Sequence, residues 1–245
     1  MSPLRRETFG ELQCTVIQTG KTPTIPVILC HGYGAPGDDL VSLAQPLCDW
    51  LGDAADLILF VFPEAPLSPP ELAMYGGRAW WPINMAKLLA ASQTGRFEEL
   101  HEVEPPGLDE ATDKLVDCIN AILKSIPDYK AMLLGGFSQG AMVTMNAALR
   151  SEIPAPAILA QFSGTVVCRP QWQHALETGR LKDTLVIQSH GRQDNVLPFT
   201  SAGVLHDMLV AAHVKTKWMP FDGPHTIPMD ALSEIAVKLA DLSTP

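Results

Sequence analysis

Residues 131–150 have the sequence AMLLGGFSQGAMVTMNAALR, from which the class of fold can be inferred. It carries no charge before Arg150, and it is long enough to raise the question of a membrane span. Its centre argues against a span, because the glycines and polar side chains there would leave backbone groups without partners in lipid. We predict instead a buried strand at Ala131–Leu134, a tight turn and a helix at Gly140–Arg150.

The turn between this strand and this helix holds Gly136-Phe137-Ser138-Gln139-Gly140, a G-x-S-x-G pattern. A strand that turns sharply into a helix forces the serine into strained backbone dihedrals, and flanking glycines avoid collisions with the neighbouring chain. The hydroxyl group of Ser138 then projects into solvent. Between a strand and a helix the pattern favours a nucleophilic serine, and the alternative is a chance match in a structural turn.

Outward from this turn, short apolar runs alternate with amphipathic stretches. The alternation predicts a mostly parallel central sheet with helices on both faces. The Thr19–Pro23 turn is too short for a crossover, so we expect Leu12–Gln18 to pair antiparallel at one edge. The other predicted strands are Ile25–Cys30, Leu57–Phe62, Ala157–Phe162, Leu185–Gln188 and Lys217–Phe221, and the other predicted helices are Asp39–Leu51, Asp109–Ser125, Ser201–Ala212 and Met229–Leu242.

The composition excludes several classes of protein. Of the 245 residues 47% are hydrophobic and 18% charged, which predicts one folded domain over residues 1–245. A net charge of −10 would repel a phosphate backbone, so nucleic acid is not an expected partner. The five cysteines are widely spread and form no C-x-x-C pair, which favours reduced thiols in a cytoplasmic protein over a zinc or redox site. Acidic residues near the N-terminus interrupt any secretory signal.

The segment 63–108 does not follow the alternation. It is rich in proline, contains Trp80-Trp81 and predicts one short helix at Asn84–Ala91. Loops of this length in compact domains usually carry function, so we expect the segment to border a substrate groove. Its tail Glu98–Glu104 holds four acidic residues and His101, which is expected to be exposed. A solvated surface is the simpler interpretation of this tail, and a binding role is the alternative.

A serine nucleophile needs a base, and the base needs an acid to orient it. His225 follows the last predicted strand, at the edge of the sheet where open α/β folds bind ligands. Asp194 follows the strand Leu185–Gln188 at the same edge, and Asp222 is its only serious competitor. We therefore expect Ser138, His225 and Asp194 to form a catalytic triad, while His206 and His213 are expected to be structural.

The early motif Cys30-His31-Gly32-Tyr33-Gly34 follows the predicted strand Ile25–Cys30. A His-Gly-x-Gly loop in this place brings a backbone N–H group to the reaction centre. Together with the amide that follows the nucleophile it would form an oxyanion hole. The predicted donors are the amides of Tyr33 and Gln139, and His31 is expected to brace the loop.

At this point the chain resembles the carboxylesterase/phospholipase family of α/β-hydrolases, which includes the acyl-protein thioesterases. The resemblance covers most of the chain. It implies an α/β-hydrolase fold, the same triad, and hydrolysis of carboxylic ester or thioester bonds without a cofactor. The chain departs from the family at Pro82, where the family usually has aspartate, and in a longer 83–107 segment. The matching residues are 31–34, 62–66, 79–81, 136–140, 190–194 with Pro198, and 223–228.

The predicted function is a serine carboxylesterase that works through an acyl-enzyme intermediate and prefers short to medium acyl chains. Its partner is a small-molecule ester or acyl thioester, stable membrane insertion is not expected, and the protein is a monomer or a homodimer. A hydrolase-fold ligand-binding protein with little turnover is the rival from another class, and acyl transfer or peptide cleavage is a rival reaction. The residues proposed to line the acyl site, with ordinary packing as the alternative, are Leu67, Met74, Trp80 and Trp81.

Overall fold

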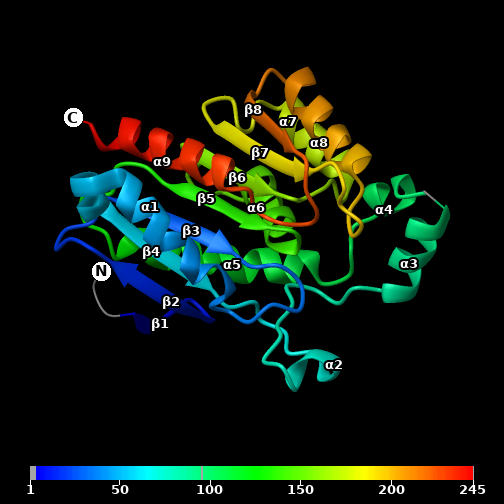
Figure 1. Ribbon diagram of the computed structural model, residues 1–245, viewed down its shortest axis with the longest axis horizontal. Helices are drawn as coiled ribbons and strands as arrows, with labels where there is room; N and C mark the ends of the chain where they lie inside the picture. Colours follow the sequence, from blue (N-terminus) through cyan, green and yellow to red (C-terminus); the bar gives the residue numbers. More distant parts are fainter. Residues whose placement is uncertain (1–3, 95, 245) are drawn as a thin grey trace.

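The computed structural model describes residues 4–94 and 96–244 and is built around one sheet (Figure 1). Within these residues eight strands follow the order β1-β2-β4-β3-β5-β6-β7-β8. The strands from β3 to β8 are parallel, so their carboxyl ends meet at one edge. The strands are β1 (Arg5–Phe9), β2 (Leu12–Gln18), β3 (Ile25–Cys30), β4 (Ile58–Pro63), β5 (Leu133–Phe137), β6 (Ile158–Phe162), β7 (Leu185–Gly191) and β8 (Lys215–Phe221).

The antiparallel strand β2 has the predicted bounds and direction but not the predicted place. It lies second from the edge, because the charged strand β1 pairs with it and occupies the edge position. Its inner neighbour is β4 and not β3, the next strand in sequence. The sequence Arg5-Arg6-Glu7-Thr8-Phe9 gives β1 little apolar periodicity, which is why the prediction omitted it.

Helices cover both faces of the sheet, as predicted. Two buried clusters separate the faces: residues of α1 and α9 pack in one, and residues of α5, α6, α7 and α8 pack in the other. Alternate residues of β3 enter different clusters, with Ile28 in the α5 to α8 cluster and Val27 in the other. These helices, with two short 3₁₀ turns, are η1 (Asp39–Leu43), α1 (Ala44–Leu51), η2 (Gly52–Leu57), α5 (Leu108–Lys124), α6 (Gln139–Arg150), α7 (Arg169–Glu177), α8 (Phe199–Ala211) and α9 (Met229–Ser243).

The long segment between β4 and α5 contains three short helices. They are α2 (Pro70–Ala73), α3 (Met85–Thr94) and α4 (Glu98–Glu102). Figure 1 shows α2 projecting from the body of the molecule, and α3 and α4 beyond the edge where the parallel strands end. The segment therefore borders the edge that the sequence motifs occupy. Among the described residues no helix combines the length and the apolar composition that crossing a bilayer requires.

The acidic tail of this segment is mostly exposed, as expected, but its histidine is not. His101 was predicted to be exposed, but it is only 2% exposed, because α4 packs against α7 and turns this side chain inward. Glu102 pairs with Arg169 at 3.0 Å and Glu104 pairs with Arg150 at 2.9 Å. The tail is thus attached to the body by ion pairs and a buried histidine.

Candidate active site

Ser138 lies directly after β5, at the N-cap of α6, as the sequence motif requires. Its φ of 54° and ψ of −118° are strained for a residue with a side chain. The Ser138 amide donates to the Phe162 carbonyl oxygen at 2.9 Å, and its own carbonyl accepts from the amides of Ala141 and Met142. The surrounding backbone therefore holds the serine in its strained conformation at the start of a helix.

The two glycines of the motif allow β3 to approach this turn closely. A Cβ atom on Gly140 would lie 2.0 Å from the Cys30 carbonyl oxygen, and one on Gly136 would lie 2.6 Å from the same atom. On the other side, a Cβ atom on Gly32 would lie 3.2 Å from Cβ of Ser138. The loop after β3 therefore lies directly against the serine, where a backbone donor for an oxyanion must be.

Asp194 and His225 form the hydrogen-bonded pair that the sequence predicted. The His225 Nδ1 atom lies 2.6 Å from Asp194 Oδ2; the aspartate side chain is fully buried, and that of the histidine is 16% exposed. The loops that carry them are joined, because the Gln193 amide donates to the Gly223 carbonyl oxygen at 3.1 Å. In a neutral imidazole, an Nδ1–H group that donates to a carboxylate leaves Nε2 unprotonated, which is the tautomer a general base needs.

The competing acid, Asp222, occupies a different environment. Its side chain is 83% exposed, and it pairs with Arg192 at 3.4 Å. A solvated carboxylate of this kind orients a neighbouring imidazole weakly. The geometry thus favours Asp194 as the partner of His225.

A second histidine on Asp194 was missed in the sequence. His190 Nε2 lies 3.1 Å from Asp194 Oδ2 and 2.8 Å from the Leu197 carbonyl oxygen, and its side chain is fully buried. Asp194 Oδ1 accepts from the amides of Val196 and Leu197 at 2.8 and 2.9 Å. The i, i+4 spacing of His190 and Asp194 around the end of β7 was the available signal.

These donors determine the charge state of the acid. Burial by itself would raise the pKa of Asp194. The hydrogen bonds from His190 and His225, together with the Leu197 amide, outweigh burial and hold the pKa of this carboxyl group well below its usual range. Asp194 is therefore a fixed anion beside the imidazole that it orients.

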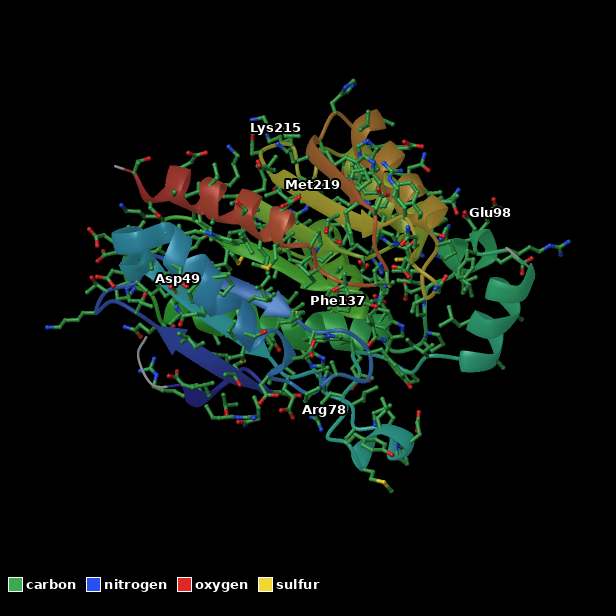
Figure 2. All side chains as sticks on the ribbon, in the orientation of Figure 1. Asp49, Arg78, Glu98, Phe137, Lys215 and Met219 are labelled. Carbon is green, nitrogen blue, oxygen red and sulfur yellow. The ribbon has the colours of Figure 1, made fainter. Side chains whose placement is uncertain are left out.

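The serine and the histidine lie at the same edge of the sheet. Ser138 directly follows Phe137, whose ring centroid is 4.7 Å from that of His225. Figure 2 shows Phe137 at the end of β5, at this edge. The structure thus brings the three residues of the predicted triad to the ends of β5, β7 and β8.

The predicted oxyanion loops also meet at Ser138. Gln139 is the first residue of α6, where backbone N–H groups have no intrahelical acceptor. His31 braces the other loop: its Nδ1 lies 2.8 Å from the Gly32 carbonyl oxygen, and its Nε2 accepts from the Ala65 amide at 3.1 Å. Burial lowers the pKa of His31, so that the ring stays neutral in this position. The half-buried Tyr33 directs its hydroxyl group to Glu71 at 3.2 Å.

The four residues predicted to line the acyl site differ widely in burial. Trp80 and Trp81 are 1% and 4% exposed and belong to the core. Leu67 is half-buried and forms a short antiparallel bridge with Ala79. Met74 follows α2 and is 84% exposed. Sequence periodicity could not predict which of these side chains are buried, because a long irregular segment has no regular buried face.

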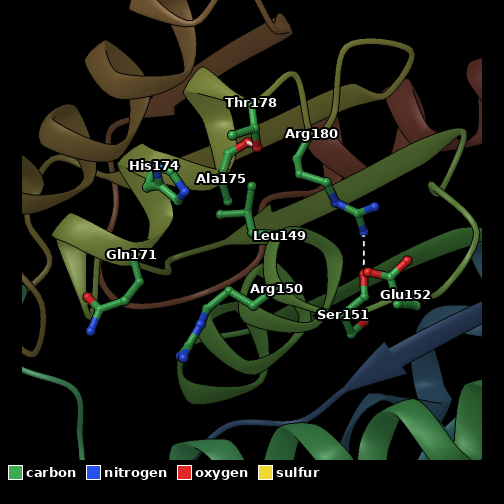
Figure 3. Close-up of a pocket in the computed structure, with 9 residues that line it drawn as sticks. All are labelled: Leu149, Arg150, Ser151, Glu152, Gln171, His174, Ala175, Thr178 and Arg180. Carbon is green, nitrogen blue, oxygen red and sulfur yellow. Dashed lines mark hydrogen bonds between the residues drawn. The ribbon is translucent and has the colours of Figure 1, made fainter.

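A surface hollow of about 360 Å³ lies elsewhere, beside the end of α6 and along α7 (Figure 3). Its wall includes Arg150, His174 and Arg180, and Arg180 donates to the Ser151 carbonyl oxygen at 2.6 Å. Ser138 and His225 are not part of this wall. In the part of the chain that the structure describes, no three His, Cys, Asp or Glu side chains cluster as metal ligands would.

The sheet order, the strained serine between a strand and a helix, and the Asp–His pair after two later strands together define the α/β-hydrolase class. Residues 12–242 match the model of the phospholipase/carboxylesterase family, and the chain belongs to this family of hydrolases.

Its relatives include acyl-protein thioesterase 1 of Eremothecium gossypii, 30% identical over 186 residues that cover 73% of this chain and 70% of that protein. Acyl-protein thioesterase 1 of Yarrowia lipolytica is 25% identical over 218 residues, which cover 86% and 89% of the two chains. Among solved structures, esterase PE8 shares the fold with a TM-score of 0.75 at 24% identity, over 94% of this chain and 99% of that one.

Proposed function

We propose that this chain is a serine esterase in which Ser138 is the nucleophile, His225 the general base and Asp194 the acid that orients it. The observation that carries the proposal is the 2.6 Å contact between His225 Nδ1 and the buried, anionic Asp194, beside a strained serine. A serine hydroxyl is a poor nucleophile on its own, and such a pair is the arrangement that activates it.

In the proposed cycle His225 Nε2 accepts the proton of Ser138 as its oxygen attacks the carbonyl carbon. The amides of Tyr33 and Gln139 bind the oxyanion that forms. The same imidazolium then donates the proton to the leaving alcohol or thiol, which leaves an acyl-enzyme. Water, activated by His225, hydrolyses this ester and restores the serine.

The proposed substrates are small carboxylic esters, with acyl thioesters as the second class to test. Two curated relatives are named acyl-protein thioesterases, which supports including a thioester. We propose short to medium acyl chains, because the segment with α3 and α4 is anchored at the edge where the acyl group must lie. Of the predicted lining residues, half-buried Leu67 is retained as a contact, while Trp80 and Trp81 support the site as packing.

The test compares Ser138→Ala with Ser151→Ala, since these serines flank the two ends of α6. Ser138→Ala is expected to lower kcat by about 10⁴–10⁶ on aryl esters, because triad residues act as a unit, and to abolish labelling by a phosphonate. Ser151→Ala should retain activity within about twofold. A Ser138→Ala protein with a tenth of the original activity would show that the nucleophile is another residue.

A second experiment distinguishes an enzyme from a binding protein. The parent protein is mixed with acetyl, butyryl, octanoyl and palmitoyl esters and with one octanoyl thioester. Release of the leaving group is followed by stopped flow. Multiple turnovers with a burst of leaving group support an acyl-enzyme. Saturable binding without turnover on every substrate would favour the ligand-binding alternative.

A further inference from the structure

Residues 78–81 form a strap that runs from one predicted oxyanion loop to the other. At its first end, the Arg78 amide donates to the Ala35 carbonyl oxygen at 3.0 Å, and the Gly34 amide donates to the Arg78 carbonyl oxygen at 2.8 Å. A Cβ atom on Gly77 would lie 2.6 Å from the Gly34 carbonyl oxygen, so the residue before the strap packs directly against this loop. In Figure 2 Arg78 lies on the α2 side of the molecule, away from the labelled Phe137 at the end of β5.

At its other end the strap is held by one buried side chain, that of Gln139. The Trp80 amide donates to Gln139 Oε1 at 2.9 Å, and Gln139 Nε2 donates to the Trp81 carbonyl oxygen at 2.9 Å. Gln139 is 1% exposed. A backbone N–H only donates and a carbonyl only accepts, so the amide fits in one orientation, and neither glutamate nor methionine can make both bonds.

A third bond ties the strap to the residue that precedes Gly32. The Trp80 indole Nε1 donates to the His31 carbonyl oxygen at 2.9 Å. The fully buried Trp80 thus contacts both loops, Gln139 through its backbone and His31 through its ring. Buried hydrogen bonds of this kind specify one arrangement, because a broken one leaves an unsatisfied polar group in the core.

We propose that the side chain of Gln139, acting through this strap, sets the separation of the two oxyanion donors. Gln139 then has two roles: its backbone amide binds the oxyanion, and its side chain positions the loop that supplies the Tyr33 amide. An oxyanion needs both donors at hydrogen-bond distance in the transition state, so a shift of a few tenths of an ångström in one loop weakens catalysis more than ground-state binding. This inference rests on the proposed function, whose nucleophile Ser138→Ala tests separately.

The decisive variant is Gln139→Met, which keeps the backbone amide and the approximate side-chain volume but removes both bonds. The matched control is Gln188→Met, since Gln188 is also 1% exposed and donates to the Ala202 carbonyl oxygen at 2.9 Å, away from the strap. Each protein is assayed for kcat and KM on a butyryl aryl ester. Each is also assayed for Ki of an alkyl trifluoromethyl ketone, which the serine converts to an anionic adduct that needs the oxyanion hole. Thermal unfolding reports folding.

Gln139→Met is expected to lower kcat about ten- to hundredfold and to raise Ki by a similar factor, with KM within about threefold. Gln188→Met should change kcat and Ki less than twofold. A folded Gln139→Met with parent kcat and Ki, or with lower kcat and an unchanged Ki, overturns the proposal. If Gln139→Met does not fold, Gln139→Glu decides, because it keeps the side-chain shape and the acceptor for the Trp80 amide but removes the Nε2–H donor to the Trp81 carbonyl oxygen. A parallel change of at least twofold in kcat and Ki supports the proposal, and unchanged values overturn it.

Discussion

The ends of β5, β7 and β8 differ from the segment 63–108 in what holds them in place. Ser138, Asp194 and His225 lie one to four residues after strands of the same sheet, and the loops of Asp194 and His225 are bonded to each other through the backbone. The long segment has backbone bonds at Arg78, but elsewhere it is held by side chains from distant elements, among them Gln139 and Arg150. Positions that follow from strands are reproduced by any sequence with the right motif, whereas positions held by side chains depend on individual partners.

The two regions should therefore respond differently to substitution. A change at the strand ends removes a reacting group, and the rate falls by orders of magnitude while the fold persists. A change in the anchors of the segment moves groups without removing them, so smaller effects on rate or stability are expected. The ion pairs of Glu102 and Glu104 and the buried His101 are such anchors.

The largest difference between two chemically similar residues is expected at the aspartates. Asp194→Asn should lower kcat by about 10⁴, because the amide favours the wrong tautomer of His225. Asp222→Asn, with a side chain 83% exposed and bonded to Arg192, should stay within about threefold. Both are measured on the same aryl ester at saturating concentration. The reverse order of severity would assign the acid to Asp222.

His190 shares features of both regions. It is buried beside Asp194 at the end of a strand, like the triad residues, but like the anchors it is not proposed to touch substrate. His190→Leu removes the Nε2–H donor and is expected to lower kcat about tenfold, while His190→Gln, whose amide can donate, should recover most of the loss.

Acid unfolding gives a second measurement on His190. Asp194 has a folded pKa below its unfolded value, so its contribution to stability is present above the unfolded pKa and is lost as the pH falls. Without His190 that pKa rises, and His190→Leu should unfold at a higher pH than the parent protein. An unchanged acid midpoint with unchanged kcat would mean that His190 only fills space.

The contrast also explains what could be predicted from the sequence. Apolar runs of β3, β5 and β6 and the G-x-S-x-G turn are local signals, so the parallel sheet and the place of Ser138 could be inferred. The pairing of Asp194 with His225 followed from the rule that parallel strands end at one edge. The charged edge strand β1 has no such signal, and the sheet order places β2 beside β4 through contacts remote in sequence.

The anchors of the long segment could not be predicted in the same way. The sequence motif predicts an oxyanion role for the backbone amide of Gln139. Nothing in the local sequence indicates that its side chain binds the backbone of Trp80 and Trp81. His101 lies in an acidic run that favours exposure, and only the docking of α4 on α7 buries it. Such contacts depend on tertiary packing, which overrides local composition.

The burial of His101 predicts a pH dependence of stability. Burial, together with the nearby Arg169, lowers the pKa of His101 to about 4. Above the unfolded pKa of about 6.5 both states are neutral; at lower pH the unfolded state binds the proton first, so stability falls. His101→Gln should remove about 2 kcal/mol of the loss between pH 7 and pH 5, measured by urea unfolding.

The matched control for this measurement is His174→Gln, at an exposed position on α7. It is expected to keep the pH dependence of the parent protein. If His101→Gln and His174→Gln lose stability equally on acidification, the α4 anchor does not depend on a neutral imidazole at His101.

The smallest effect is expected at Met74, in the part of the long segment beside α2. Its side chain is 84% exposed after the projecting helix α2 (Figure 1), so it has little contact to lose. Met74→Ser should leave kcat/KM for acetyl to octanoyl esters within about twofold of the parent value. Leu67→Ala, at a half-buried position of the same segment, is the comparison. A methylene buried against protein is worth about 0.8 kcal/mol, or roughly fourfold in kcat/KM. If Met74→Ser lowers kcat/KM by a factor that grows with chain length, the acyl chain reaches α2, and the projecting helix belongs to the substrate site after all.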